Sequence, residues 1–463
     1  MRRLASLLAS IALASPAFGA DAPVALRAEA RALFESIIAM DTSVTKHEVP
    51  AMAGLLAERF RAAGFPTEDV HIVPFHDTAS LVVRYRGDGS GGRPVAFLAH
   101  MDVVTAKRSD WQRDPFRLTE EAGYFYGRGT ADVKQEVALL TATFLNLKAT
   151  GFVPSRDLII AFSGDEESAQ DSTVDLVDNH HDLIDAEYAL NGDGGGGVFD
   201  EATGKPTLYY VQGAEKSAAT YLLTTRNAGG HSSQPRADNA IYDLADALKA
   251  VQRLRFPIQW SDWTISDLKA AGHVTPGALG AALRRFAAKP GDGAAAREIE
   301  RSPAFIGKIR TTCVATQLEG GHAENALPQS AVATINCRIF PGTSAAAVQQ
   351  ALQAAVGERV EIAMRYTPLV SDASPLRPDV MAAVDKALRA STPGAVVVPT
   401  MAVYATDGSV FRRGGIPTYG VDSTFMKRSD EFRHGLNERI AVDAFYAGLP
   451  FWDTLIRTIA GKP

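Results

Sequence analysis

Residues 94–102 of the chain read PVAFLAHMD, a short apolar run that ends directly in a histidine and an aspartate. The same arrangement occurs twice more, because residues 158–167 read LIIAFSGDEE and residues 186–193 read AEYALNGD. Apolar runs of this length are typical of strands that are buried on both faces of a parallel sheet. In open α/β sheets the functional crevice lies beyond the carboxyl ends of the strands. We therefore expect the three polar clusters to converge at one edge of one sheet.

Helical and strand patterns alternate around these runs. In the first part of the chain we expect helices at 26–40, 49–63 and 133–147, and strands at 80–86, 94–99, 158–162 and 186–190. From residue 374 the same pattern resumes, with helices at 379–390 and 441–459 and a strand at 416–421. Such alternation predicts an α/β fold with a mainly parallel sheet.

The middle of the chain has a different pattern. A strand at 218–226, a helix at 239–254, strands at 309–318 and 331–340 and a helix at 343–356 resemble a separate α+β layer, inserted into the first fold. Residues 255–301 contain stretches rich in Pro, Gly and Ala, and we expect an insertion or a mobile loop there.

The composition narrows the classes of function. With 463 residues, of which 46% are hydrophobic and 22% charged, the chain has the composition of a large globular protein. Its formal net charge of -6 leaves no surplus of positive charge for a nucleic acid, so DNA and RNA are not expected partners. Two cysteines cannot form a zinc finger of thiolates, so any metal must be held by histidines and carboxylates.

The first twenty residues have the layout of a secretory signal peptide. Arg2 and Arg3 precede an uncharged apolar stretch, which ends in small residues up to Ala20. A membrane anchor is the alternative, but the apolar part is shorter than the ~20 residues that span a bilayer, and Pro16 interrupts it. We expect cleavage near Ala20, export to the periplasm or the medium, and no membrane attachment after cleavage.

The two cysteines lie on the two strand-like runs of the middle layer. Antiparallel pairing of these runs about Asn325 would place Cys313 and Cys337 roughly opposite each other. In an oxidising compartment they could form a disulfide, and two buried free thiols are the alternative.

Asp132 begins the predicted helix at 133–147 and follows the segment YGRGTA at 126–131. An aspartate at this position commonly caps a helix N-terminus. The other interpretation is a carboxylate that binds one metal ion with each oxygen and holds a metal pair about 3.5–4 Å apart.

These residues resemble the co-catalytic zinc family of glutamate carboxypeptidase, aminoacylase, acetylornithine deacetylase and succinyl-diaminopimelate desuccinylase. The family pattern is His-x-Asp, then Gly-Arg-Gly-x-x-Asp, then Glu-Glu, then an acidic residue, and finally a distant histidine. The chain matches this order with His100, Asp132, Glu166-Glu167, Asp193 and His434. The resemblance covers nearly the whole chain after residue 20.

The resemblance implies a division of the chain and a ligand set. With the signal peptide expected at 1–20 from its own pattern, the resemblance implies a zinc-peptidase catalytic domain at 21–213 and 371–463, and a lid and dimerisation domain at 214–370. It also implies two Zn²⁺ ions per subunit, for which Co²⁺ can substitute. One ion would be bound by His100 and Asp193, the other by Glu167 and His434, and both by Asp132. Imidazole nitrogens and carboxylate oxygens suit Zn²⁺.

Two further residues have implied roles at this centre. Asp102 would accept a hydrogen bond from the second ring nitrogen of His100 and so fix its tautomer. Glu166 would leave the metals free, take a proton from a metal-bound water and deliver it to the leaving amine. The alternative for Glu166 is a buried glutamate paired with a lysine.

The middle layer resembles the lid of this family, which packs the dimer, so a homodimer is expected. By this resemblance His231 reaches the site of the partner subunit and stabilises the oxyanion of the intermediate. Asn325 and Arg338 match positions that hold the carboxylate of the substrate, for which the guanidinium fork is suited. The alternatives are an exposed histidine beside a glycine turn for His231 and a solvated strand residue for Arg338.

The chain departs from the family pattern at two positions. Gln135 stands where the family usually has glycine, and Asp193 where many members have glutamate. Signals of other chemistries are missing from the sequence. It has no Gly-x-Ser-x-Gly elbow, and the glycines at 194–197 are not followed by the Lys-Ser/Thr of a phosphate loop.

Taken together, the sequence predicts an exported di-zinc hydrolase that cleaves an amide bond next to a free carboxylate. A dipeptidase or carboxypeptidase acting on small peptides is our first expectation, because export favours peptides over biosynthetic intermediates. Hydrolysis of N-acyl amino acids by the same metals is the alternative. A non-catalytic exported binding protein of the same fold would be expected to lack a ligand or the base, and here all six positions are filled.

Overall fold

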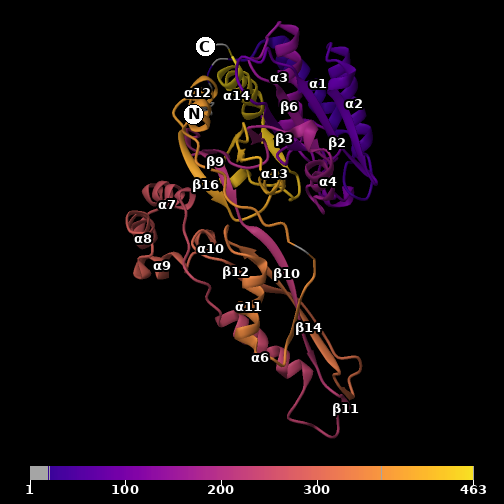
Figure 1. The fold of residues 1–463 in the computed structure, drawn as a ribbon, viewed down its shortest axis with the longest axis vertical. Helices are drawn as coiled ribbons and strands as arrows, with labels where there is room; N and C mark the ends of the chain where they lie inside the picture. The colour runs from indigo at the N-terminus through magenta and orange to yellow at the C-terminus, as the bar shows by residue number, and fades with distance from the viewer. Residues whose placement is uncertain (1–18, 20, 367, 462–463) are drawn as a thin grey trace, which may run out of the picture.

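A computed structural model describes residues 19, 21–366 and 368–461 and divides into an α/β body and an elongated arm (Figure 1). The predicted signal peptide at 1–20 lies outside the described residues except for Gly19. None of the described helices is long and apolar enough to cross a membrane.

The body is built on a ten-stranded sheet, in which the three apolar runs are neighbours. The sheet order is β1-β2-β6-β3-β7-β17-β9-β8-β18, and β16 pairs with β9. The central strands β6 (Leu158–Ser163), β3 (Val95–His100) and β7 (Tyr188–Asn191) are parallel and fully buried. Their carboxyl ends therefore meet at one edge, and the prediction of a mainly parallel central sheet is confirmed.

The outer strands extend this sheet on both sides. On one side lie β2 (Thr78–Tyr85) and β1 (Val70–Phe75), which are antiparallel to their neighbours. On the other side lie β17 (Thr418–Gly420), β9 (Pro206–Glu215), β8 (Gly196–Phe199), β18 (Phe425–Met426) and β16 (Val396–Ala402). A small three-stranded sheet, β4 (Thr119–Glu121), β5 (Tyr124–Tyr126) and β19 (Arg439–Ala441), is separate from it.

Helices cover both faces of the large sheet, which explains why its central strands are continuously apolar. On one face Phe97 and Ile160 belong to a core with α1 (Val24–Ile38), α2 (Val49–Ala62), α3 (Lys134–Ala149), α12 (Pro378–Ser391) and α14 (Val442–Ala460). On the other face Leu98 and Ile159 pack with α4 (Asp171–Asn179), α5 (His181–Ile184) and α13 (Asp407–Arg413).

The arm is an antiparallel sheet in the order β12-β14-β10-β15 that is covered by two helices (Figure 1). Its strands are β10 (Ser217–Arg226), β12 (Thr312–Gly320), β14 (Ser330–Ile339) and β15 (Glu361–Met364). Its helices are α6 (Ala240–Arg253) and α11 (Ala345–Val356). At the far tip β11 (Gly230–His231) pairs with β13 (Ala326–Leu327).

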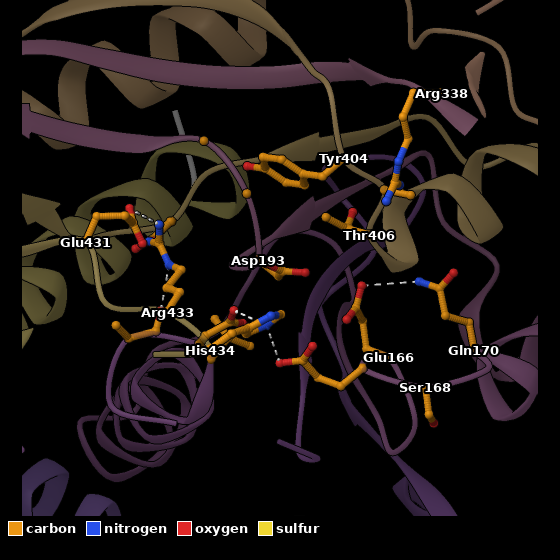
Figure 2. Close-up of a pocket in the computed structure, with 18 residues that line it drawn as sticks. Glu166, Ser168, Gln170, Asp193, Arg338, Tyr404, Thr406, Glu431, Arg433 and His434 are labelled. Carbon is orange, nitrogen blue, oxygen red and sulfur yellow. Dashed lines mark hydrogen bonds and ion pairs between the residues drawn. The ribbon is translucent and has the colours of Figure 1, made fainter. Parts of the chain in front are cut away.

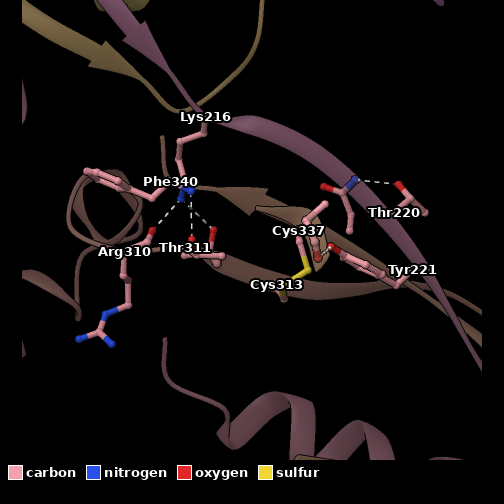
Figure 3. Close-up of a disulfide and its surroundings, with 11 residues drawn as sticks. Lys216, Thr220, Tyr221, Arg310, Thr311, Cys313, Cys337 and Phe340 are labelled. Atoms are coloured by element: carbon pink, nitrogen blue, oxygen red, sulfur yellow. Dashed lines mark hydrogen bonds between the residues drawn. A yellow bond between two sulfur atoms is a disulfide. The ribbon is translucent and has the colours of Figure 1, made fainter. Parts of the chain in front are cut away.

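The strand register of the arm brings the two cysteines together. Cys313 on β12 is the register partner of Cys337 on β14, and the two form a disulfide (Figure 3). Of the two states considered from the sequence, the structure has the disulfide.

The expectation of a mobile loop at 255–301 is wrong. This segment forms the helices α7 (Asp262–Val274), α8 (Gly277–Ala288) and α9 (Gly293–Ile299), followed by the short α10 (Pro303–Ile306). Alanine favours helices, and Pro257, Pro276 and Pro290 lie outside the helices, whereas Gly272 and Gly280 lie within α7 and α8. Leu268, Leu283 and Phe286 give the segment a core of its own. Trp263 of α7 packs into the core of the body, so these helices lie against the body although they follow strand β10 of the arm.

Candidate active site

The polar clusters predicted from the sequence converge at the carboxyl edge of the central strands (Figure 2). His100 is the last residue of β3, Glu166 and Glu167 follow β6, and Asp193 follows β7. Two triplets offer ligand atoms that all lie within 4.8 Å of one another, and they share His100. The triplets are His100 with Glu166 and Asp193, and His100 with Asp132 and Glu167.

Asp132 stands between the two histidines of the site. Nε2 of His100 lies 3.2 Å from Oδ1 of Asp132, and Nε2 of His434 lies 3.1 Å from Oδ2 of the same carboxylate. Helix α3 begins only at Lys134 and has no side-chain cap, so Asp132 is not a plain helix cap. A carboxylate with one oxygen toward each of two groups is the arrangement that a bridging metal ligand requires.

His434 comes from the loop between β18 and β19 and also contacts Glu167. Its Nε2 lies 2.9 Å from Oε1 of Glu167. Hydrogen bonds to Asp132 and Glu167 raise the pKa of His434 to about 10. Burial opposes the charged form of Asp132, but His100 and His434 hold the pKa of this carboxyl well below its ordinary value. The carboxylates of Asp132 and Glu167 thus strongly favour a positive charge between them.

The role predicted for Asp102 is divided between two parts of this residue. The Nδ1–H of His100 donates to the backbone carbonyl of Asp102 at 3.0 Å, and the nearest carboxylate oxygen lies 3.5 Å away. The carboxylate accepts the backbone N–H groups of Glu166 at 3.1 Å and Glu167 at 3.0 Å. Asp102 therefore orients the imidazole and also fixes the turn that carries both glutamates.

Among the residues that the structure describes, no lysine pairs with Glu166, so the alternative considered for it is not what the structure shows. Nε2 of Gln170 donates to its Oε1 at 3.2 Å (Figure 2). Burial, followed by the nearby carboxylate of Asp193, raises the pKa of Glu166 well above its ordinary value. A half-buried carboxylate with a raised pKa beside a candidate metal position is suited to act as a general base.

The charge balance of the site fits divalent cations. Within the described part of the chain no hydrogen-bond donor reaches the carboxylate of Asp193, and burial raises its pKa well above the ordinary value. Asp193 and Glu166 are thus crowded carboxylates that bear a high electrostatic cost without a cation. The donor set of imidazole and carboxylate groups is the one that zinc and related metals accept.

A buried ion pair that the sequence did not predict holds the loops of the site together. Oε1 of Glu438 accepts the backbone N–H groups of Ala131 at 2.8 Å and Asp132 at 3.1 Å. Its Oε2 accepts a hydrogen bond from Nη1 of Arg128 at 2.5 Å, and both side chains are buried. Burial raises the pKa of Glu438 to about 7, although Arg128 lowers it. The only sequence signals were the Gly-Arg-Gly motif around Arg128 and the nearness of Glu438 to His434.

Arg433, next to His434, makes a second connection of this kind. Its Nη2 donates to Oδ2 of Asp422 at 3.0 Å, and its Nε donates to the carbonyl of Ala131 at 3.1 Å. Arg433, which precedes the candidate ligand His434, is thereby joined to Ala131, which precedes the candidate ligand Asp132. Sequence reasoning gave no reason to select Arg433.

A pocket of about 550 Å³ lies over these residues. In the part of the chain that the structure describes, Arg338 is the one arm residue that lines it, and it approaches from β14 (Figure 2). No carboxylate of the described residues forms an ion pair with Arg338, which is half-buried. A guanidinium without a partner on the wall of a pocket is suited to bind a carboxylate of a ligand.

The structure of one chain does not bring His231 and Asn325 to this pocket. Both residues are exposed at the far tip of the arm, close to β11 and β13 (Figure 1). Ser233 contacts Nδ1 of His231 at 2.8 Å, and the backbone carbonyl of Asn325 accepts the N–H of Ser232. Within a single subunit these residues lie apart from Arg338 and from the candidate ligands.

Comparison with known proteins agrees with this site. The chain is 28% identical over 393 residues to "N-fatty-acyl-amino acid synthase/hydrolase PM20D1" of Xenopus tropicalis, which covers 82% of this chain and 75% of that protein. It is 25% identical over 418 residues to "Aminoacylase-1" of Mus musculus, with 88% and 90% covered. The fold superposes on the M20 family metallo-carboxypeptidase Sso-CP2 from Sulfolobus solfataricus with a TM-score of 0.69, at 16% identity and with 93% and 99% of the two chains covered.

The resemblance stated from the motifs is confirmed, because residues 96–458 match Peptidase family M20/M25/M40. A non-catalytic binding protein is therefore not retained as an interpretation. The chain belongs to Peptidase family M20/M25/M40 and is a hydrolytic, metal-dependent enzyme.

Proposed function

We propose that this enzyme binds two Zn²⁺ ions and hydrolyses an amide bond next to a free carboxylate. One observation carries the proposal: the half-buried Glu166, beside the candidate ligands, lines the same pocket as Arg338, which has no ion-pair partner among the described residues. The base and the anchor for a carboxylate thus line one pocket of about 550 Å³.

In this proposal each residue of the site has one role. When bound, the metal pair polarises the amide carbonyl and lowers the pKa of a bound water. Glu166 takes the proton from the attacking water and delivers it to the leaving amine nitrogen. The metal ligands are His100, Asp132, Glu167, Asp193 and His434. Co²⁺ would be accepted in place of Zn²⁺, because it binds the same donor types.

Two substrate classes fit an amide next to a carboxylate. N-acyl amino acids are favoured by the relatives, which are named as an N-fatty-acyl-amino acid hydrolase and an aminoacylase. Dipeptides and the C-terminal bond of a peptide, our first expectation from the sequence, present the same group to Arg338 and are the second candidate. Both classes leave the proposed roles of the metals and Glu166 unchanged.

Export and dimer formation are part of the proposal. The signal-like residues 1–20 and the disulfide between Cys313 and Cys337 support an oxidising compartment outside the cytoplasm. The exposed position of His231, far from the pocket of its own chain, supports a role in the pocket of a partner subunit. There its imidazole would stabilise the oxyanion of the intermediate.

The activity is tested with purified protein, first treated with a chelator and then reloaded with Zn²⁺ or Co²⁺. We expect the treated protein to be inactive and the reloaded protein to cleave dipeptides or N-acyl amino acids. The same substrates with the carboxylate converted to an amide should be poor. A reloaded protein that cleaves none of them would refute the proposal.

The role of the partner subunit is tested by mixing two inactive variants, His231→Ala and Glu166→Ala. A mixed dimer has one site with both residues intact, so mixing should restore about a quarter of the wild-type activity. If His231 acts within its own chain, mixing restores nothing.

A further inference from the structure

We propose that a second cavity, adjacent to the catalytic pocket, binds the acyl chain of the substrate and selects long aliphatic chains. This inference rests on the proposed function, because it takes the amide next to a carboxylate as the bond that is cleaved. It adds the substrate class: N-acyl amino acids with an aliphatic acyl group.

The second cavity begins at the catalytic centre. It has a volume of about 500 Å³ and shares Gly195 and Tyr404 with the catalytic pocket. Gly195 lies two residues after the candidate ligand Asp193. A group that extends from the metal site past Tyr404 is therefore directed toward this cavity. Its volume lies within the range of about 300–1,000 Å³ that is usual for ligand pockets.

Its walls come from the body sheet and from the helices at 262–306. The aliphatic and phenyl side chains that line it lie on β8, β9, β16, α7 and α10 and next to β16, and they are Val198, Phe199, Leu208, Ala271, Val274, Ala304, Phe305, Ala402 and Val403. Val274 is 61% exposed and Val403 38% exposed. Exposed apolar side chains that gather in a cavity mark a site for an apolar ligand.

The charged groups inside the cavity neutralise one another. Nζ of Lys308 lies 2.6 Å from Oδ2 of Asp267, which also accepts a hydrogen bond from Thr400 at 2.7 Å. The remaining charged lining residues, Asp200, Glu201 and Arg428, are exposed. The interior thus presents an internal ion pair rather than a free charge for the ammonium group of a peptide, and an uncharged chain suits it better.

The position of Arg338 decides which half of the substrate enters the second cavity. Arg338 lines the catalytic pocket but not the second cavity. With the carboxylate held by Arg338, the amino acid lies on the side of the arm, and the acyl group is left to extend past Tyr404. Hydrolysis adds water across the C–N bond: the acyl carbon gains the hydroxyl and the nitrogen gains a proton. The products are a fatty acid and a free amino acid.

The test compares N-acetyl-, N-hexanoyl- and N-decanoyl-leucine with zinc-loaded protein. We expect kcat/KM to rise with chain length, by up to about fourfold for each methylene that is buried. Val274→Trp places a large side chain in the cavity from an exposed position on α7. It should lower the ratio of kcat/KM for decanoyl to acetyl substrate about tenfold or more. Val153→Trp, at a site 55% exposed and outside the cavity, should leave this ratio unchanged.

Three results would overturn the inference: a kcat/KM independent of acyl length, an unchanged ratio in Val274→Trp, or a preference that follows the amino acid side chain instead. If no substrate is cleaved, the proposed function fails. The role of the cavity is then tested separately, by measuring how tightly the protein binds the N-acyl amino acids. Calorimetry with the Glu166→Ala protein should show tighter binding of N-decanoyl-leucine than of N-acetyl-leucine. Adding Val274→Trp should remove the difference, and equal binding of the two ligands in Glu166→Ala counts against the cavity as the acyl site.

Discussion

Nε2 of His434 lies 3.1 Å from Oδ2 of Asp132, although the two residues come from opposite ends of the body sequence. Asp132 precedes the first helix after the Gly-Arg-Gly motif, and His434 lies in a loop shortly before the last helix. The candidate metal centre is therefore completed only when the second catalytic segment packs against the first.

Replacement of His434 by alanine should weaken metal binding. The variant loses one imidazole ligand of the second ion, and even loss of a supporting partner of a ligand costs about 10–100-fold in affinity. The metal content after dialysis and the affinity for Zn²⁺ in competition with a chelator measure this. His181→Ala, at a half-buried histidine of α5 that does not line the catalytic pocket, is the control. Equal zinc affinity in both variants would contradict the assignment.

Glu166→Gln and Glu167→Gln should differ although the residues are neighbours. Glu166→Gln removes the base and should lower kcat by about 10²–10⁴-fold with the metal content intact. Glu167→Gln removes a carboxylate ligand and should lower the metal content. Metal analysis and kcat measured on the same samples separate the two effects. Full turnover in Glu166→Gln would show that another group acts as the base.

Arg338→Ala should lower kcat/KM for substrates with a free carboxylate by about 10- to 100-fold. This is the loss expected when a hydrogen bond to a charged group, which contributes about 1.5–3 kcal/mol, is removed. Substrates in which the carboxylate is an amide should be cleaved equally poorly by variant and wild type. Arg338→Lys keeps the charge but not the fork and should fall between them. A loss in Arg338→Ala that is equal for both kinds of substrate means that Arg338 does not contact the carboxylate.

Glu438→Gln should destabilise the fold. Arg128 would remain as a buried charge without its counterion, which costs about 3–5 kcal/mol. Urea unfolding monitored by circular dichroism measures the loss in free energy of unfolding. The double variant Arg128→Met, Glu438→Gln removes the buried charge and should recover part of that loss. No recovery would locate the role of Glu438 in its bonds to the backbone of Ala131 and Asp132.

Lys216 should make the stability depend on pH. Burial, followed by the charges of Arg338 and Lys308, lowers the pKa of Lys216 to about 7, and its Nζ donates to the carbonyl of Arg310 at 2.8 Å (Figure 3). Between pH 7 and about 10 the unfolded chain then binds more protons at this site than the folded chain, so the free energy of unfolding rises with pH. Lys216→Met should flatten this rise in urea titrations at pH 7, 8 and 9. An identical pH slope in wild type and variant would exclude Lys216 as its source.

The sequence by itself determined the local elements and the order of the ligands. The strands β3 and β6 and the helix α14 lie within a few residues of their predicted bounds. A strand buried on both faces is a continuous apolar run, and a helix buried on one side has apolar residues at helical spacing, so both can be recognised in the sequence. The candidate ligands were found because each follows or precedes such an element within a short motif. The helices α7 to α9 were missed because the Pro residues between them and the Gly residues inside them favour a loop in the sequence pattern.

Only the tertiary structure decided which distant residues meet. Glu438 and Arg433 bind the backbone beside Asp132, and Arg338 enters the pocket while His231 and Asn325 stay at the tip of the arm. The second cavity likewise exists only because α7 and α10 pack against β9 and β16. The physical reason is that a local pattern records which side of an element is buried, whereas the partner that covers it is chosen by packing and charge between segments far apart in the chain.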